Sequence, residues 1–257
     1  MGKIKIMAKY RLVGETSKLF FAFSLGLLIT VILGNFSFLA FEAMRAAGVS
    51  FSDYVTENAV YALLSAAGII IFLTVYAPLR LGTERWFLFV GKGEKAPVTE
   101  LFYYFSPRRI IVSIRAVLFC AVKKTAAFLL FVFPSACLFG VLYFSLGEGE
   151  ISAYVSYAVF AFAAVLFLSG LVFYFIYSAR YFAYYSVYVS NETIKPNEAF
   201  EKSMEITHGA YGRISFFRIS FLPWFLLCLP VLPAFYVWGY YKEAKAMLCL
   251  RNDALHS

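Results

Sequence analysis

Side chains that could carry acid–base or metal chemistry are scarce in this chain of 257 residues. The histidines are His208 and His256, and the aspartates are Asp53 and Asp253. A metal site needs several converging ligands, and an activated nucleophile needs a base held by an acid. The sequence has no metal-binding H-E-x-x-H, no glycine-rich phosphate loop and no C-x-x-C. It therefore predicts a protein that is not an enzyme and that holds no cofactor and no metal.

The cysteines have no metal-type spacing and lie mostly within apolar runs, at Cys120, Cys137, Cys228 and Cys249. We expect free, buried thiols at these positions rather than disulfides.

A row of tyrosines is the most regular polar feature. It recurs at spacings of three and four, at Tyr174, Tyr177, Tyr181, Tyr184 and Tyr188. On a helix this spacing places the phenols on one face. They could form the polar lining of a cavity, or an interfacial aromatic belt that packs against neighbouring helices. We favour the belt.

Polar side chains inside apolar runs are the remaining candidates. Asn35 lies within the first such run, and its amide should point into a helix bundle to find a partner. Arg218 could bind a ligand or extend to lipid phosphates, and Arg213 should contact phosphate too. The full set of candidate polar or lipid-contacting positions is Asn35, Tyr174, Tyr177, Arg180, Tyr181, Arg213 and Arg218.

The composition indicates an integral membrane protein. Hydrophobic residues make up 62% of the chain and charged residues 15%, whereas a soluble domain has about 25% charged residues. The net charge of +8 comes from basic residues clustered beside apolar segments, as topology signals are, so a nucleic-acid partner is not expected. The expected partners are the lipid bilayer and the anionic headgroups on its cytoplasmic side. Further copies of this chain or other proteins could join it in a homo- or hetero-oligomer.

The apolar runs predict an all-α, polytopic transmembrane bundle of about six helices with short cytoplasmic amphipathic helices. A basic segment, 1–18, precedes one membrane domain, 19–250, and a tail, 251–257. The expected spans are 19–43, 58–79, 124–146, 151–178, 214–229 and 232–247. The stretch 214–250 could instead cross once, but the hairpin keeps all basic residues except Arg45 on the inside. Both termini are then cytoplasmic, in a plasma membrane.

A stripe of small residues marks one face of the first span. Ala22, Gly26, Thr30 and Gly34 recur every four residues. Small side chains let helices approach closely in lipid, so we expect a helix contact here.

Two inner segments have helical patterns of their own. Residues 108–118 alternate arginines with apolar residues, which predicts an amphipathic surface helix or an early start to the third span. A further helix should begin at Pro196 and end before Gly209, with Glu198 paired to Lys202. We expect the face that holds Phe200 to pack against protein or against the membrane surface.

The later motifs resemble an uncharacterised bacterial integral membrane family, domain of unknown function 975. The resemblance covers about residues 96–252. It rests on EAFEKSMEITHG, SFFRISFLPW, GYYKEAKAMLCL and an ELF-x-x-F element at Glu100, Leu101, Phe102 and Phe105. The family's Gly-His pair is inverted here as His208-Gly209, its Gly-Trp pair is Pro223-Trp224, and Gly239 replaces a proline. The resemblance implies a polytopic bacterial membrane protein and no established activity.

Two functions fit this sequence. One is an accessory or organising membrane component without catalysis. The alternative is a transporter or lipid-handling protein with a site among the membrane helices, favoured by the tyrosine face, Asn35 and the proline-broken last helices. A polar cavity that touches both Asn35 and the tyrosines would favour transport.

Overall fold

The computed structural model describes residues 2–46, 54–148, 153–191, 193–226 and 231–256. Helices are the only regular elements in these residues. The α-helices are α1 (Gly2–Val13), α2 (Thr16–Gly34), α3 (Phe36–Ala46), α4 (Tyr54–Lys92), α5 (Pro107–Glu148), α6 (Ala153–Tyr177), α7 (Tyr184–Ser190), α8 (Pro196–Thr207), α9 (Tyr211–Ile219), α10 (Leu222–Leu226) and α11 (Val231–His256). Two 3₁₀ helices, η1 (Val98–Phe105) and η2 (Ser178–Tyr181), connect them. The all-α prediction is confirmed for this part of the chain.

Four segments are long and apolar enough to cross a membrane. Within the described residues they are Thr16–Gly34, Ala59–Lys92, Pro107–Val141 and Tyr157–Ser190. The chain is therefore a multi-pass membrane protein by the length and composition of its helices. The six-span arrangement stays a prediction, and its turn near residues 229–232 lies partly outside the described residues.

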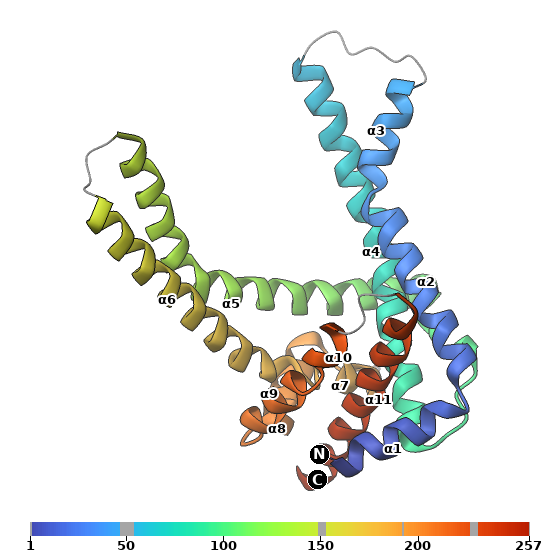
Figure 1. The fold of residues 1–257 in the computed structure, drawn as a ribbon. Coiled ribbons are helices and arrows are strands. Elements are labelled where there is room, and N and C mark those ends of the chain that lie inside the picture. The colour runs from blue at the N-terminus through green and yellow to red at the C-terminus, as the bar shows by residue number, and fades with distance from the viewer. Residues whose placement is uncertain (1, 47–53, 149–152, 192, 227–230, 257) are drawn as a thin grey trace.

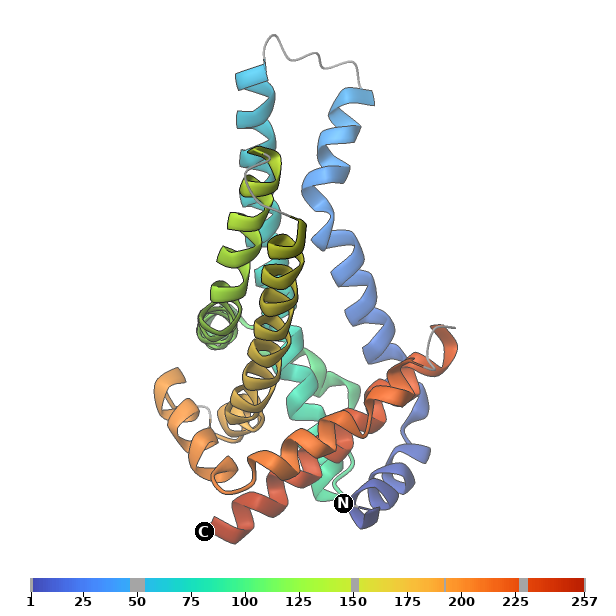
Figure 2. The same ribbon diagram turned by 60° about the vertical axis from the view of Figure 1, so that its left-hand side comes forward.

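Two helical hairpins rise from a base of shorter helices (Figures 1 and 2). The first hairpin consists of α2, α3 and the N-terminal half of α4, and the second of α6 and the C-terminal half of α5. The base contains α1, the C-terminal half of α4, η1, η2 and α7 to α11, and both chain ends lie in it (Figure 1). The first half of α5 runs across from the base of one hairpin to the other.

Helix α4 passes from an exposed to a buried environment along its length. In the hairpin, Leu63 and Ile70 expose 72% and 63% of their surface, whereas Trp86 and Phe87 in the base are fully buried. Its 39 residues would extend about 58 Å, more than a bilayer core of about 30 Å. The helix continues past Pro78 to Lys92, where it packs in the base, and the end of the membrane span near residue 79 stays a prediction.

The other long segments differ in continuity. Helix α5 runs unbroken from Pro107 to Glu148, so the arginine-rich segment is the start of the third long helix, one of the two alternatives. The tyrosine row does not lie on one continuous helix, because α6 ends at Tyr177 and the 3₁₀ turn η2 separates it from α7.

The small-residue face of α2 does not contact a helix closely at its glycines. A Cβ added to Gly26 or Gly34 would meet no atom within 4 Å, so the expected contact at these two positions is wrong for the single chain. Close approach occurs elsewhere: a Cβ at Gly82 would collide with the Leu101 backbone of η1, and one at Gly170 with the Phe131 backbone of α5. These glycines let α4 meet η1 and α6 meet α5.

Helix α8 follows its predicted bounds. It begins at Pro196, and Gly209 has a φ of 70°, as expected for a residue that ends a helix. The expected ion pair is wrong: Glu198 accepts a hydrogen bond from the Lys195 backbone N–H at 3.4 Å instead of pairing with Lys202. Phe200 stacks on Tyr181 with ring centroids 4.9 Å apart, so it faces protein rather than the membrane surface.

Candidate functional site

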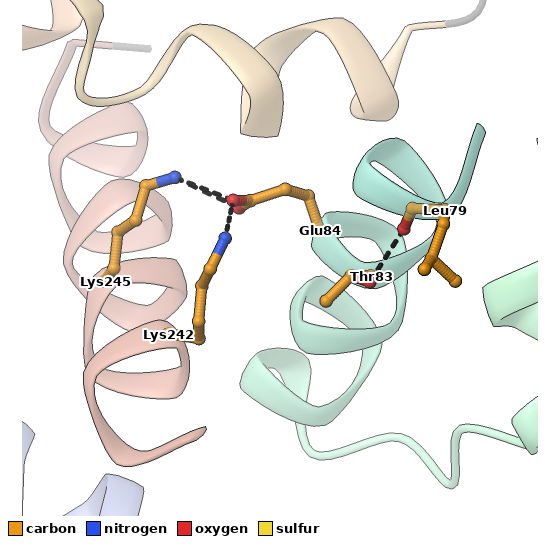
Figure 3. Close-up of polar contacts among 5 residues, drawn as sticks. All are labelled: Leu79, Thr83, Glu84, Lys242 and Lys245. Carbon is orange, nitrogen blue, oxygen red and sulfur yellow. Dashed lines mark hydrogen bonds and ion pairs between the residues drawn. The ribbon is translucent and has the colours of Figure 1, made fainter. Parts of the chain in front are cut away.

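A buried ion network joins α4 to α11 in the base (Figure 3). Glu84 of α4 accepts hydrogen bonds from Lys242, through Oε1, and from Lys245, whose Nζ lies 3.0 Å from Oε2. The three side chains are only 2%, 5% and 7% exposed. Lys242 and Lys245 stand three residues apart on α11, so one helix face aims both at the same carboxylate.

Positive charge around Glu84 exceeds what this acid can neutralise. Arg80 lies one helical turn before Glu84, and Lys124 of α5 is within electrostatic range of both Arg80 and Lys245. Neither Arg80 nor Lys124 forms an ion pair with any described residue. Instead they lie over aromatic rings, Arg80 at 5.3 Å from the centroid of Tyr185 and Lys124 at 5.6 Å from that of Tyr181. We call Arg80, Glu84, Lys124, Lys242 and Lys245 the cationic cluster.

The cluster's electrostatics reflect this surplus. Burial, and then the charge of Arg80, lower the pKa of Lys242 below its ordinary value, although Glu84 opposes the shift. An additional anion nearby would oppose these effects and stabilise the charged lysine.

A second buried acid on α11 faces away from this cluster. Glu243 is fully buried, and neither carboxylate oxygen accepts a hydrogen bond from a described residue. Burial raises the pKa of Glu243 to about 8, and the guanidinium of Arg11 on α1 opposes the shift. Arg11 itself donates to the carbonyls of Val90 and Gly91, at the end of α4.

A cavity of about 230 Å³ opens beside the cationic cluster, between α2, α4 and α11. Arg80, Thr83 and Lys242 form its polar part. Its other walls are mostly apolar or aromatic and are formed by Ala22, Phe23, Gly26, Leu27, Thr30, Tyr76, Leu79 and Trp238. The Thr83 hydroxyl donates to the Leu79 carbonyl at 2.7 Å within α4 (Figure 3).

The predicted tyrosine row packs against protein. Tyr174 meets Phe128 edge-on at 5.3 Å, and Tyr177 lies 5.7 Å from Phe131. Further along, the hydroxyls of Tyr184 and Tyr188 donate to the α5 carbonyls of Ala116 and Val112, at 3.0 and 3.3 Å. These contacts support the packing alternative over a cavity lining.

Asn35 does not point into a bundle. Its side chain is exposed, and its amide donates to the Val31 carbonyl on its own helix at 2.7 Å. This local bond replaces the partner that was expected from another helix. Asn35 belongs to the first hairpin and the tyrosine row starts in the second, so the structure does not bring these predicted residues together (Figure 1).

The three candidate arginines have different environments. Arg218 donates to the hydroxyl and the carbonyl of Ser178, at 2.7 and 3.0 Å, so it binds the start of η2. Arg180 lies over the ring of Tyr177 at 4.7 Å, and Arg213 is exposed. Phosphate contact stays a prediction for Arg213.

Sequence reasoning missed the cationic cluster. The expected span 58–79 ends just before Arg80, and the general pattern of basic residues beside apolar runs makes Lys242 and Lys245 indistinguishable from topology signals. A local signal existed: Arg80 and Glu84 are four residues apart, and the two lysines three apart. The pairing itself links residues separated by 158 positions and could not be read from spacing.

Of the expected thiols, Cys120 and Cys249 are buried and Cys137 is exposed, and none of these three forms a disulfide. Cys228 lies outside the described residues. No group of three or more His, Cys, Asp or Glu side chains that could hold a metal occurs within the described segments.

Comparison of the chain with protein-family models, curated proteins and solved structures finds no match. The resemblance to the family of unknown function therefore stays a prediction, and the function has to be argued from the site itself.

Proposed function

We propose that this chain is a non-enzymatic, multi-pass membrane protein that holds anionic lipid at its base and acts as an accessory or organising component of the membrane. The observation that carries the proposal is the cationic cluster, which holds four basic side chains and one acid, and in which Arg80 and Lys124 form no direct ion pair with a described residue. Buried or half-buried charges are normally paired, so an anion from outside the chain would complete the cluster.

Membrane lipids are a ready source of such an anion. The cluster lies where the exposed apolar half of α4 gives way to its buried half. A basic site at the end of a membrane helix, facing the cytoplasm, is suited to lipid headgroups. We place the base in the cytoplasm because the predicted outer loops contain only Arg45 as a basic residue.

Four spans fit this arrangement better than six. Helix α11, which contains the expected span 232–247, carries Lys242, Glu243 and Lys245 buried against other parts of the base. Ionisable groups are costly inside a bilayer, and here they pack in the base instead. Four and six spans alike leave both termini on the cytoplasmic side of a plasma membrane.

The proposal is tested by the lipid that accompanies the protein. We expect protein purified in mild detergent to carry anionic lipid, and the Arg80→Gln/Lys124→Gln variant to carry several-fold less, measured by mass spectrometry of extracted lipid. The control is Arg115→Gln/Lys123→Gln, which removes two exposed charges from α5. Equal anionic lipid in all three proteins would refute the proposal.

A further inference from the structure

We propose that the cavity between α2, α4 and α11 binds one anionic amphiphile, with its phosphate at Arg80, Thr83 and Lys242 and its hydrocarbon chain along the small-residue face of α2. This inference rests on the proposed function and names the ligand and its orientation. The cavity has a volume of about 230 Å³. We expect it to hold the phosphate and the first part of the hydrocarbon chain.

The polar end of the cavity is suited to a phosphate. Arg80 lines it and forms no direct ion pair with a described residue, although Glu84 attracts it from one helical turn away, and Lys242 contributes a second cation. Arginine presents several donors in a planar fork that matches phosphate oxygens. Thr83 lines the same end; its hydroxyl proton is bonded to the Leu79 carbonyl at 2.7 Å and would reach a phosphate only by leaving that carbonyl.

The other end is suited to a hydrocarbon chain. Ala22, Gly26 and Thr30 lie one turn apart on α2 and line the cavity. The Thr30 hydroxyl is already bonded to the Gly26 carbonyl at 2.8 Å, which leaves its methyl group as the available surface. Space above Gly26 is open, since a Cβ there would meet nothing within 4 Å. The small residues thus leave room for a ligand rather than for a second helix.

The position of the cavity favours a lipid over a free anion. Its wall on α2 is continuous with apolar residues that are exposed on the same helix, such as Leu27 and Leu28, at 47% and 55%. In a membrane these side chains meet lipid, so a chain could enter from the bilayer while its phosphate reaches the base. A soluble phosphate would leave the apolar walls of the cavity exposed. A hydrocarbon chain would cover them, and the burial of this apolar surface would increase the affinity.

Binding to the purified protein in a neutral detergent tests this proposal. The probes are dodecyl phosphate, dodecanol and inorganic phosphate, titrated by native mass spectrometry. We expect dodecyl phosphate to bind at least tenfold more tightly than either of the other probes. Arg80→Gln removes a cation from the polar end, and Gly26→Leu fills the chain end, so each should weaken dodecyl phosphate binding about tenfold.

Matched variants serve as controls. Gly34→Leu adds the same side chain to α2 at another open position outside the cavity lining, and Arg115→Gln removes an exposed arginine from α5. Both should bind dodecyl phosphate as the unmodified protein does. If Arg80→Gln fails to fold, Gly26→Leu decides alone, because its side chain enters open space.

Three results would overturn the proposal: dodecanol binding as tightly as dodecyl phosphate, inorganic phosphate binding as tightly, or full affinity in Gly26→Leu. If anionic lipid co-purifies while Gly26→Leu keeps full affinity, the proposed function stands and only the cavity is refuted. If no anionic lipid accompanies the protein, the proposed function fails as well.

Discussion

Glu84 binds two lysines of α11, a helix that is distant in sequence. How much these ion pairs contribute to the stability of the fold depends on their burial. Removing two charges from water costs several kcal/mol, so a buried pair is not by itself strong evidence for stability. Removing one partner is different, because the remaining charges stay buried without compensation. In this protein the remaining charges would be Lys242 and Lys245, close to Arg80.

We therefore expect Glu84→Gln to lower the free energy of unfolding by about 3–5 kcal/mol, the range for breaking a buried pair. Denaturant unfolding in detergent measures it. The control is Glu198→Gln on α8, where the glutamate side chain is 54% exposed and faces Lys195 at 3.9 Å. That exposed pair should contribute under about 1 kcal/mol. Comparable losses in the two variants would show that the network is weakly coupled to folding.

Glu243 predicts a dependence of stability on pH. Its pKa is raised from 4.5 to about 8 in the folded protein. Between these values the unfolded chain has lost the proton that the folded chain keeps, so the contribution of Glu243 to stability declines as pH rises from 4.5 to about 8. The groups that face it are Arg11 from α1 and the backbone of Gly91 from α4.

Glu243→Gln removes this titration. We expect its melting temperature to rise relative to the unmodified protein as pH increases from 5 to 8, with the smallest difference at pH 5. Thermal unfolding across that range measures the difference. A constant offset at every pH would mean that Glu243 titrates normally in the folded protein.

At the scale of elements, close backbone approach is concentrated at a few glycines. Gly82 lies where η1 crosses α4, and Leu101 of η1 is fully buried there. In the same region, the Arg85 Nε donates to Glu100 at 2.7 Å. The loop after α4 is therefore held against the helix by both packing and charge.

We expect Gly82→Ala to destabilise the protein by about 1–3 kcal/mol, the cost typical of overpacking, because the new Cβ collides with backbone that cannot rotate away. Gly34→Ala is the matched control. Its Cβ meets nothing, so its effect should be neutral or stabilising by up to about 1 kcal/mol. Unfolding of both variants in detergent distinguishes them; an unchanged stability in Gly82→Ala would mean that η1 does not approach α4 this closely.

Local patterns predicted the elements well and their partners poorly. Pro196 and Gly209 placed α8 correctly, since caps act within a few residues. The apolar runs likewise identified the long helices. The continuation of α4 past Pro78 depends on η1 and α11, and the cationic cluster depends on residues 158 positions apart. Sequence spacing carries no information on such long-range contacts. The sequence therefore shows the residues of the cationic cluster without showing that they contact one another.

For the whole molecule, the decisive question is how many times the chain crosses the bilayer. Reporters fused after Ser257 and inserted in residues 147–150 should report opposite sides with either four or six spans. A tag between residues 229 and 232 separates the two: our four-span arrangement places it inside, together with Ser257, and six spans place it outside. Accessibility to an impermeant reagent in intact cells measures this, and labelling from outside would restore the six-span hairpin.

The distance along the chain between Glu84 and its partners has a consequence for biosynthesis. A ribosome adds about 5–20 residues per second, so the 158 residues that separate Glu84 from Lys242 take about 8–30 s to make. During that interval α4 can already be inserted in the membrane, although Lys242 and Lys245, which neutralise Glu84, have not yet been synthesised. The base can close only after α11 emerges, when α1 and α4 gain their shared partner. Assembly of this protein would thus proceed in two stages, with insertion of the hairpins first and docking of the last helix afterwards.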